Sequence, residues 1–400
     1  MTGSEAAAWG GGSPALQGLL SGYVADGRLA GAVAAVIDRT GLRHRLVAGV
    51  QDLDSAVPMA WDSVFRIYSM TKPVTSIAAM MLWEEGRFAL DDPVAGWLPA
   101  FAAPQVLLPG GGTRPAAGPV TVRHLLSHTA GMTLPAFADD PLVPLYLANG
   151  LDGIRSTPPL AAAVDRLGRM PLLFDPGTRW RYSMATDAVG RLVELWSGMP
   201  FEDFIDRRIL APLGMTETGF RVPAGAAGRL VTTYAVTDGR LGAAIDRGVD
   251  STFLRPPAYI CPAGGLVSTA ADYLRLMAML LHGGSLDGVR VLQPETVALM
   301  HRNHLPGDMA AMGAGDFNGA SWAGIGFGLG FSTVLDPARA GLPPGAVDYG
   351  WTGAAGTAFL VNPEAGIAAL LLAQYMPSRA YPLRAEFRQA VYRDLARGDG

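Results

Sequence analysis

Residues 69–72 are Ser69-Met70-Thr71-Lys72, directly in front of an apolar stretch with the spacing of a helix. Because residues three apart share one face of a helix, the Ser69 hydroxyl and the Lys72 amine would be neighbours one turn apart. The hydroxyl would also lie at a helix N-terminus, where unpaired backbone N–H groups favour developing negative charge. This combination of a hydroxyl, an amine and a positive field indicates a catalytic role for the segment rather than a structural one.

Stretches before residues 69–72 and near the C-terminus predict one antiparallel sheet built from both ends of the chain. Short apolar and β-branched runs are separated by Gly, Pro, Asp and Asn turn signals, which is typical of strands in hairpins. These runs are residues 30–37, 46–50, 326–334, 346–351, 357–361 and 366–374. The middle of the chain shows mainly helical spacing, interrupted by Pro. We therefore expect an α+β fold, with an antiparallel sheet flanked by helices and a mostly helical second lobe.

The same pattern gives the domain boundaries. We place residues 1–99 and 226–400 in one lobe with the central sheet, and residues 100–225 in the inserted helical lobe. Between residues 100 and 119 the composition turns to Pro, Gly and Ala, so we interpret this segment as a loop. The helices expected around the sheet are residues 14–27, 69–85, 270–282 and 382–396.

The composition limits the classes of partner. Half of the 400 residues are apolar, yet no apolar run approaches the roughly 18 residues that a membrane span needs. The formal net charge of −4, without a basic run, gives no indication of nucleic acid or of an anionic membrane as partner. Cys261 is the single cysteine, which excludes an intrachain disulfide and a cysteine-based metal site. Residues 1–12 lack the features of a secretory signal, so we expect a cytoplasmic protein.

Two further segments follow along the chain, Tyr182-Ser183-Met184 and Trp351-Thr352-Gly353. A lone Ser-x-x-Lys is a frequent coincidence, in which the serine caps a helix and the lysine is solvated. Its combination with the tyrosine segment and with Thr-Gly, in this order, favours a serine acyl-enzyme site. The chain contains no Gly-x-Ser-x-Gly, so the nucleophile elbow of the α/β-hydrolases is excluded.

These three segments resemble the motifs of the serine β-lactamase and penicillin-binding-protein superfamily. Within its class C-like branch, the chain is most similar to the family VIII carboxylesterases. Residues 121–131, residues 262–266 and Val361-Asn362-Pro363 also fit this group, and the resemblance extends from about Leu16 to the final helix. The fold that it implies is the β-lactamase/transpeptidase-like sheet with flanking helices.

The resemblance implies a role for each site residue. Ser69 would be the nucleophile that attacks a carbonyl carbon, and Lys72 would accept its proton or stabilise charge. Tyr182 would be the general acid and base, its phenol pKa lowered by a nearby ammonium. Whether Lys72 or Tyr182 takes the proton from Ser69 stays open. The backbone amides of Ser69 and Ala354 would form the oxyanion hole.

Two departures from the family motifs indicate the kind of substrate. Trp351 replaces the lysine of Lys-Thr-Gly and so removes a cation that could pair with the carboxylate of a β-lactam; its indole offers apolar area instead. Met184 replaces the asparagine of Tyr-x-Asn, whose amide would bind an amide of the substrate. We expect Trp351, Thr352, Gly353 and Met184 to bind an uncharged ester. Plain strand packing is the other interpretation of Trp351.

Other polar residues are given structural interpretations. His124 and His128 have the i, i+4 spacing of a zinc pair, but no glutamate completes His-Glu-x-x-His, and we expect no metal. Asp187 follows the tyrosine segment at the start of a helix, where a capping role is expected.

The resemblance thus predicts a cofactor-free serine hydrolase, a carboxylesterase that cleaves small short-acyl esters through an acyl-enzyme. Hydrolysis of β-lactams is expected only as a weak residual activity. The alternatives are an acyltransferase or an amide or β-lactam hydrolase of the same fold, and a penicillin-recognising module that is acylated without turnover. The expected partner is a small-molecule ester, not nucleic acid or a membrane. The physiological ester and the oligomeric state do not follow from the sequence.

Overall fold

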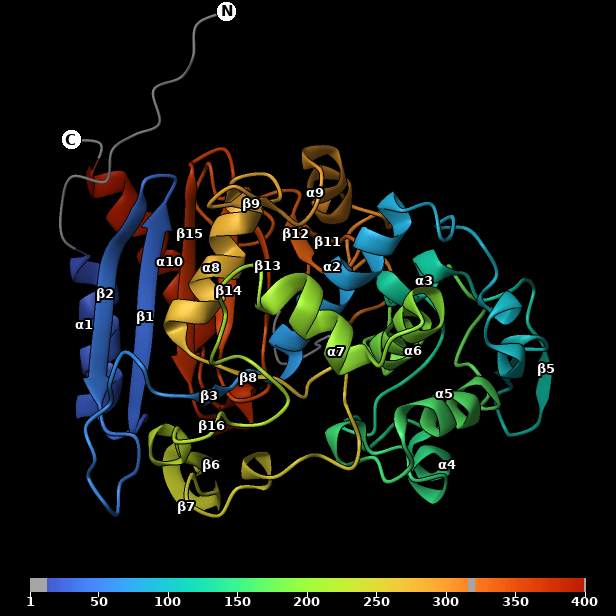
Figure 1. Cartoon of the computed structure of the whole chain (residues 1–400), viewed down its shortest axis with the longest axis horizontal. Helices are drawn as coiled ribbons and strands as arrows, with labels where there is room; N and C mark the ends of the chain where they lie inside the picture. Colours follow the sequence, from blue (N-terminus) through green and yellow to red (C-terminus); the bar gives the residue numbers. More distant parts are fainter. Residues whose placement is uncertain (1–12, 316–320, 399–400) are drawn as a thin grey trace, which may run out of the picture.

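The computed structural model describes residues 13–315 and 321–398. The N-terminal stretch in which no secretory signal is expected lies outside these ranges. At the centre is a seven-stranded antiparallel sheet in the order β11-β12-β13-β14-β15-β1-β2 (Figure 1). Its strands are β1 (Gly31–Asp38), β2 (Gly41–Gly49), β11 (Ile325–Phe327), β12 (Ser332–Val334), β13 (Tyr349–Thr352), β14 (Ala358–Asn362) and β15 (Ile367–Ala373).

The two ends of the chain meet inside this sheet. Strand β1 pairs with β2 on one side and with β15 on the other, where Ala32 lies opposite Ala373. The antiparallel sheet and its flanking helices therefore confirm the predicted α+β class. The assignment of residues 100–225 to a separate lobe stays a prediction.

Alternation along β1 supplies both faces of the sheet with core residues. Ala32, Ala34 and Val36 pack toward helices α1 (Pro14–Ala25) and α10 (Leu383–Gly398). The intervening residues belong to the larger core on the other face, where α8 (Ala270–Leu281) contacts β1 and β15. Figure 1 shows α1 and α10 behind the sheet, near β1 and β2, and α8 in front of it, on the other face.

Helix α2 (Thr71–Glu84) is the central helix of the larger core. It follows the 3-10 turn η1 (Tyr68–Met70), and its residues from Thr71 to Leu82 are all buried. A helix without a solvated face is typical of a position enclosed by other elements. Here α6 (Ala185–Ser197) packs along it, with α3 (Val122–Leu126) next to α6.

The remaining elements are short. The helical ones are η2 (Val94–Gly96), η3 (Pro99–Phe101), α4 (Val143–Ala148), η4 (Gly153–Arg155), α5 (Leu160–Gly168), α7 (Phe201–Ile205), η5 (Asp206–Leu210), η6 (Ala227–Arg229), η7 (Thr252–Leu254), α9 (Pro294–His301) and η9 (Ser378–Ala380). The strands are β3 (Phe65–Arg66), β4 (Gln105–Leu107), β5 (Thr113–Pro115), β6 (Thr233–Thr237), β7 (Arg240–Asp246), β8 (Val267–Ser268), β9 (Ser285–Leu286), β10 (Val289–Arg290) and β16 (Tyr375–Met376). In the described ranges, every helix is too short or too polar to cross a membrane.

Two sequence predictions of local structure are wrong, and one strand was missed. The run 326–334 is not one strand, because a turn at residues 328–331 folds it into the hairpin of β11 and β12. The segment 100–119 is not only a loop, since β4 and β5 pair within it. Strand β7 was not predicted, because its inner residues, Leu241 to Ile245, are small or apolar and do not alternate with polar residues as in a half-buried strand.

Candidate active site

The first site residue, Ser69, lies in the 3-10 turn η1 just before α2 begins. The preceding residue, Tyr68, has a φ of 43°, a left-handed conformation that is costly for a bulky side chain. The Ser69 side chain is partly exposed, so a substrate can reach it. This sharp turn brings the hydroxyl to the surface beside the buried start of α2.

Lys72 lies one turn further on, as its spacing predicts. Its Nζ atom is 3.4 Å from the Ser69 Oγ and donates a hydrogen bond of 2.8 Å to the carbonyl oxygen of Ala263. The ammonium also lies 4.5 Å from the centre of the Tyr182 ring. Because Lys72 is only 4% exposed, these neighbours and not water make up most of its surroundings.

Tyr182 is held immediately before α6 by other rings. The indole Nε1 of Trp351 donates to the Tyr182 hydroxyl over 3.4 Å, and the His128 ring lies 4.9 Å away, centre to centre. His128 is buried and shares a hydrogen bond of 3.2 Å with the Ser183 Oγ. Burial, and to a lesser degree the Lys72 charge, lowers the pKa of His128 well below its usual value. The ring beside Tyr182 is therefore neutral at pH 7.

The end of β13 closes the site beside the nucleophile. A Cβ atom on Gly353 would lie 2.4 Å from the Ile67 carbonyl oxygen, so only glycine allows this strand to approach η1 so closely. The next residue, Ala354, is exposed, and its amide donates no hydrogen bond within the described residues. An unpaired backbone donor next to Ser69 is the feature that an oxyanion hole requires.

Arg384 is a site residue that sequence reasoning missed. It stands at the start of α10, and its terminal nitrogen donates a hydrogen bond of 2.8 Å to the Thr352 Oγ1. Burial lowers the pKa of its guanidinium, and two of its nitrogens are buried without a hydrogen-bond partner in the described chain. The expectation that Trp351 leaves this edge of the site without a cation is therefore wrong. No motif marks Arg384 in the sequence, because it lies on a helix remote from the three segments.

An aromatic group next to Tyr182 was also missed. Trp351 contacts Phe327 and Trp322, with ring centres 5.2 and 6.1 Å apart, and Trp180 packs against Tyr182 and Phe327. The only sequence signal for this group is the density of aromatic residues near Tyr182 and after residue 320. Trp180 also lines a pocket of about 590 Å³ together with Phe137, Arg179 and Arg379, among others.

Three other residues that the sequence analysis singled out lie in structural surroundings, and only for Asp187 is the expectation wrong. Met184 is 1% exposed and forms part of the main core, so its contact with substrate stays a prediction. His124 accepts a hydrogen bond from the Thr121 amide and takes part in a helix cap. Asp187 is not a cap, because its carboxylate is buried beside Cys261, whose thiol donates to it over 3.5 Å.

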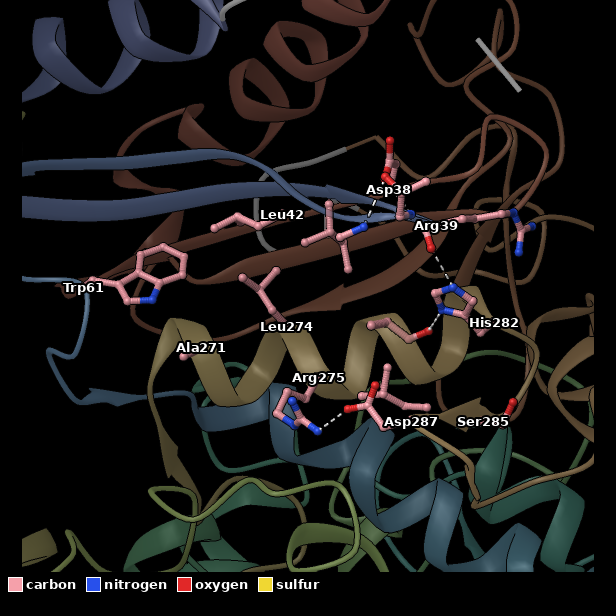
Figure 2. Close-up of a pocket in the computed structure, with 15 residues that line it drawn as sticks. Asp38, Arg39, Leu42, Trp61, Ala271, Leu274, Arg275, His282, Ser285 and Asp287 are labelled. Carbon is pink, nitrogen blue, oxygen red and sulfur yellow. Dashed lines mark hydrogen bonds and ion pairs between the residues drawn. The ribbon is translucent and has the colours of Figure 1, made fainter. Parts of the chain in front are cut away.

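A second pocket of about 590 Å³ lies elsewhere, between the β1–β2 hairpin and α8 (Figure 2). Its charged groups contact each other or the backbone. Arg275 pairs with Asp287 at 2.7 Å, and His282 bonds the Arg39 carbonyl at 3.0 Å. None of the three motif segments reaches it, so we place the candidate active site at Ser69.

Comparisons with known proteins identify the family of the chain. A family model described as Beta-lactamase matches residues 16–393. The chain is 39% identical over 364 residues to an uncharacterized protein of Mycobacterium tuberculosis, covering 88% of this chain and 87% of that protein. It is 34% identical over 384 residues to Esterase EstB of Burkholderia gladioli, covering 91% of each. The solved structure of EstCE1, described as a hydrolase with promiscuous acyltransferase activity, matches with a TM-score of 0.80 and 28% identity, covering 95% of this chain and 98% of that one.

Proposed function

This chain belongs to the β-lactamase family of serine hydrolases and acyltransferases, and from that premise we propose that it is a carboxylesterase acting on small short-acyl esters. One observation carries the proposal. The Lys72 ammonium lies between the Ser69 hydroxyl, at 3.4 Å, and the Tyr182 ring, at 4.5 Å. This is the contact that an activated serine needs before it can attack an acyl group.

The reaction follows from these positions. The Ser69 Oγ forms a bond to the ester carbonyl carbon, and its proton passes to the neutral amine form of Lys72 or to the phenolate form of Tyr182. The amides of Ser69 and Ala354 stabilise the negative oxygen of the tetrahedral intermediate. The bond to the alkoxy oxygen then breaks, and the alcohol leaves with that proton. Water repeats the sequence on the acyl-enzyme, releases the acid and restores the Ser69 hydroxyl.

The surroundings of the nucleophile support an ester rather than a peptide. The indole of Trp351 and its neighbours Trp322 and Phe327 offer an apolar surface, and such rings bind acyl or alcohol groups without a charge. Relatives named as an esterase and as a hydrolase with acyltransferase activity support the same reaction class. In acyl transfer, an alcohol would replace water in the second step.

Arg384 favours a second candidate, a substrate that carries a carboxylate. Its guanidinium is held at Thr352 by one nitrogen, while two others have no partner among the described residues. A buried cation is costly unless an anion compensates it. An acid-bearing ester or a β-lactam would supply that anion at the edge of the site.

The test compares a graded series of neutral acyl esters, one hemiester with a free carboxylate, and a chromogenic cephalosporin. We expect the neutral esters to be turned over fastest. Ser69→Ala should abolish all turnover, whereas the matched control Ser197→Ala, whose hydroxyl bonds the Val193 carbonyl inside α6, should not. Arg384→Gln should raise KM for the hemiester at least about tenfold if a charged hydrogen bond is lost, and leave KM for neutral esters unchanged.

Each other outcome contradicts a part of the proposal. A cephalosporin hydrolysed faster than every ester would replace the esterase with a β-lactamase. Stoichiometric labelling by a fluorescent penicillin without ester turnover would indicate a recognition module. Faster product formation when an alcohol acceptor is added would identify an acyltransferase.

A further inference from the structure

Asp187 is a buried carboxyl behind the candidate active site, in the first turn of α6. It is 1% exposed, and its Oδ1 accepts a hydrogen bond of 3.5 Å from the weak thiol donor Cys261. The Tyr259 hydroxyl and the Ala263 amide also face the carboxyl and favour its ionised form, but the hydroxyl and the Asp187 Oδ2 have no partner at full hydrogen-bond geometry within the described residues. A carboxyl so poorly bonded is costly to bury, so its retention needs a reason.

The segment from Tyr259 to Ala263 contacts both Asp187, through Cys261, and Lys72, through Ala263. It is clamped between two helices, because the Thr75 hydroxyl of α2 donates to the Pro262 carbonyl over 2.6 Å. On the other side, a Cβ on Gly190 of α6 would lie 2.2 Å from Pro262. Lys72 reaches the same segment from α2 through the Ala263 carbonyl. The ammonium and the carboxyl therefore lie against one rigid piece of backbone.

The electrostatics connect the two groups. Burial raises the pKa of the Asp187 carboxyl, and the positive charge of Lys72 opposes this increase more strongly than the Tyr259 hydroxyl or the Cys261 thiol does. The titratable groups that face Lys72 from its remaining neighbours are His128, which is neutral, and Tyr182. The Cys261 thiol is also influenced by the Lys72 charge, but burial raises the pKa of that thiol well above its usual value, so it is neutral at pH 7. Within the described residues, Asp187 is thus the carboxyl that is influenced by the ammonium of the site.

We propose that Asp187 is a positioning residue for the Ser69 and Lys72 pair, whose buried carboxylate compensates the ammonium across the Ala263 backbone. It touches no substrate and acts through Lys72. The proposal rests on the proposed function in that it assumes a reactive Ser69, and it specifies what controls that reactivity.

The sign of the effect follows for either proton acceptor. Without the negative charge of Asp187, Lys72 releases its proton more easily, and Tyr182 is exposed to a more positive field that favours its phenolate. In both cases, the pH profile of the reaction moves to lower pH. At low pH the carboxyl of the native protein is itself protonated, so native protein and the neutral variant converge there.

The experiment measures kcat/KM of butyrate ester hydrolysis from pH 5 to 10 for native protein and Asp187→Asn, a variant of equal size. We expect the acidic limb to move down by about one pH unit, as for the loss of one charge across several Å of protein. Tyr259→Phe removes a group that favours the ionised carboxyl, and it should give a smaller shift in the same direction. Asp272→Asn is the matched control, because Asp272 is also a buried carboxyl in the first turn of a helix but bonds Thr218 instead.

Asp272→Asn should leave the profile unchanged. Superimposable profiles of native protein, Asp187→Asn and Tyr259→Phe would overturn the proposal, as would an activity loss in Asp187→Asn at all pH values without displacement. If Asp187→Asn fails to fold, Tyr259→Phe decides alone, because it removes a single hydroxyl and keeps the buried ring. The rate at which a fluorophosphonate labels Ser69 is measured over the same pH range. Labelling requires only a reactive Ser69 and no turnover of an ester. A pH shift of the labelling rate without ester hydrolysis would therefore contradict the proposed esterase and leave the role of Asp187 standing.

Discussion

Tyr182→Phe is the sharpest test of proton transfer, because phenylalanine removes one oxygen and keeps the ring. The ring contacts with Lys72 at 4.5 Å, with His128 at 4.9 Å and with Trp351 at 5.5 Å should all remain. The loss is the hydroxyl that accepts from the Trp351 indole over 3.4 Å. A hydrogen bond this long contributes at the low end of the usual range, about 0.5–1 kcal/mol to the free energy of unfolding.

The effect on chemistry should be much larger than this effect on stability. Removal of a general acid or base typically costs at least about 100-fold in rate, which is about 2.7 kcal/mol of activation free energy. We therefore expect kcat for a butyrate ester to fall at least about 100-fold in Tyr182→Phe, while the urea midpoint stays close to that of native protein. Stability and activity can then be separated in one variant.

Tyr349→Phe is the matched control. Tyr349 is buried in the same strand as Trp351, and no partner for its hydroxyl lies in the described part of the chain. Its loss should leave kcat unchanged. Near-normal turnover of a folded Tyr182→Phe would refute the reasoning and assign the proton transfer to Lys72.

Two further predictions test the strand edge and the buried histidine. Gly353→Ala should lower kcat at least about 100-fold, the usual cost of a lost oxyanion donor, because its Cβ would lie 2.1 Å from the Thr357 hydroxyl and 2.4 Å from the Ile67 carbonyl oxygen. The control Gly228→Ala has open space around its Cβ and should leave kcat unchanged. A Gly353→Ala variant with normal kcat would contradict the close approach of the strand to η1. Burial depresses the pKa of His128, so its contribution to stability is present above about pH 6.5 and is lost as pH falls toward the folded-state pKa, by up to about 1.4 kcal/mol per pH unit. Urea unfolding at pH 7.5 and 5.5 should show this loss in native protein and a shallower one in His128→Gln, and equal slopes would contradict it.

The parts of the site that sequence reasoning predicted are those fixed by local geometry. The helical spacing of Ser69 and Lys72 holds because both follow one backbone path, and the structure places them 3.4 Å apart. The family prediction is confirmed for the same reason, since short motifs on regular elements keep their residue types and spacing. The sheet was also predicted, because its strands alternate between two cores.

The parts that were missed depend on contacts between remote segments. The roles of Arg384 and Asp187 follow from their hydrogen bonds with Thr352 and Cys261, which lie far from them in the sequence. A helix start with an acidic residue usually indicates a cap, and nothing local distinguishes the buried carboxyl of Asp187 from that ordinary case. Such residues are identified only when the packing of α6 and α10 is known.

The two departures at the third motif take on a different meaning once Arg384 is included. Neighbouring side chains of a strand point to opposite faces, so residues 351 and 352 present different surfaces. The structure places an indole on one and joins the other to a guanidinium at 2.8 Å. A lysine at position 351 would provide a charge at the expense of apolar area beside Tyr182. With the cation supplied by α10 instead, this strand end provides both an apolar surface and a positive charge. Under the proposed function, Arg384 is therefore the residue that would distinguish acid-bearing from neutral esters.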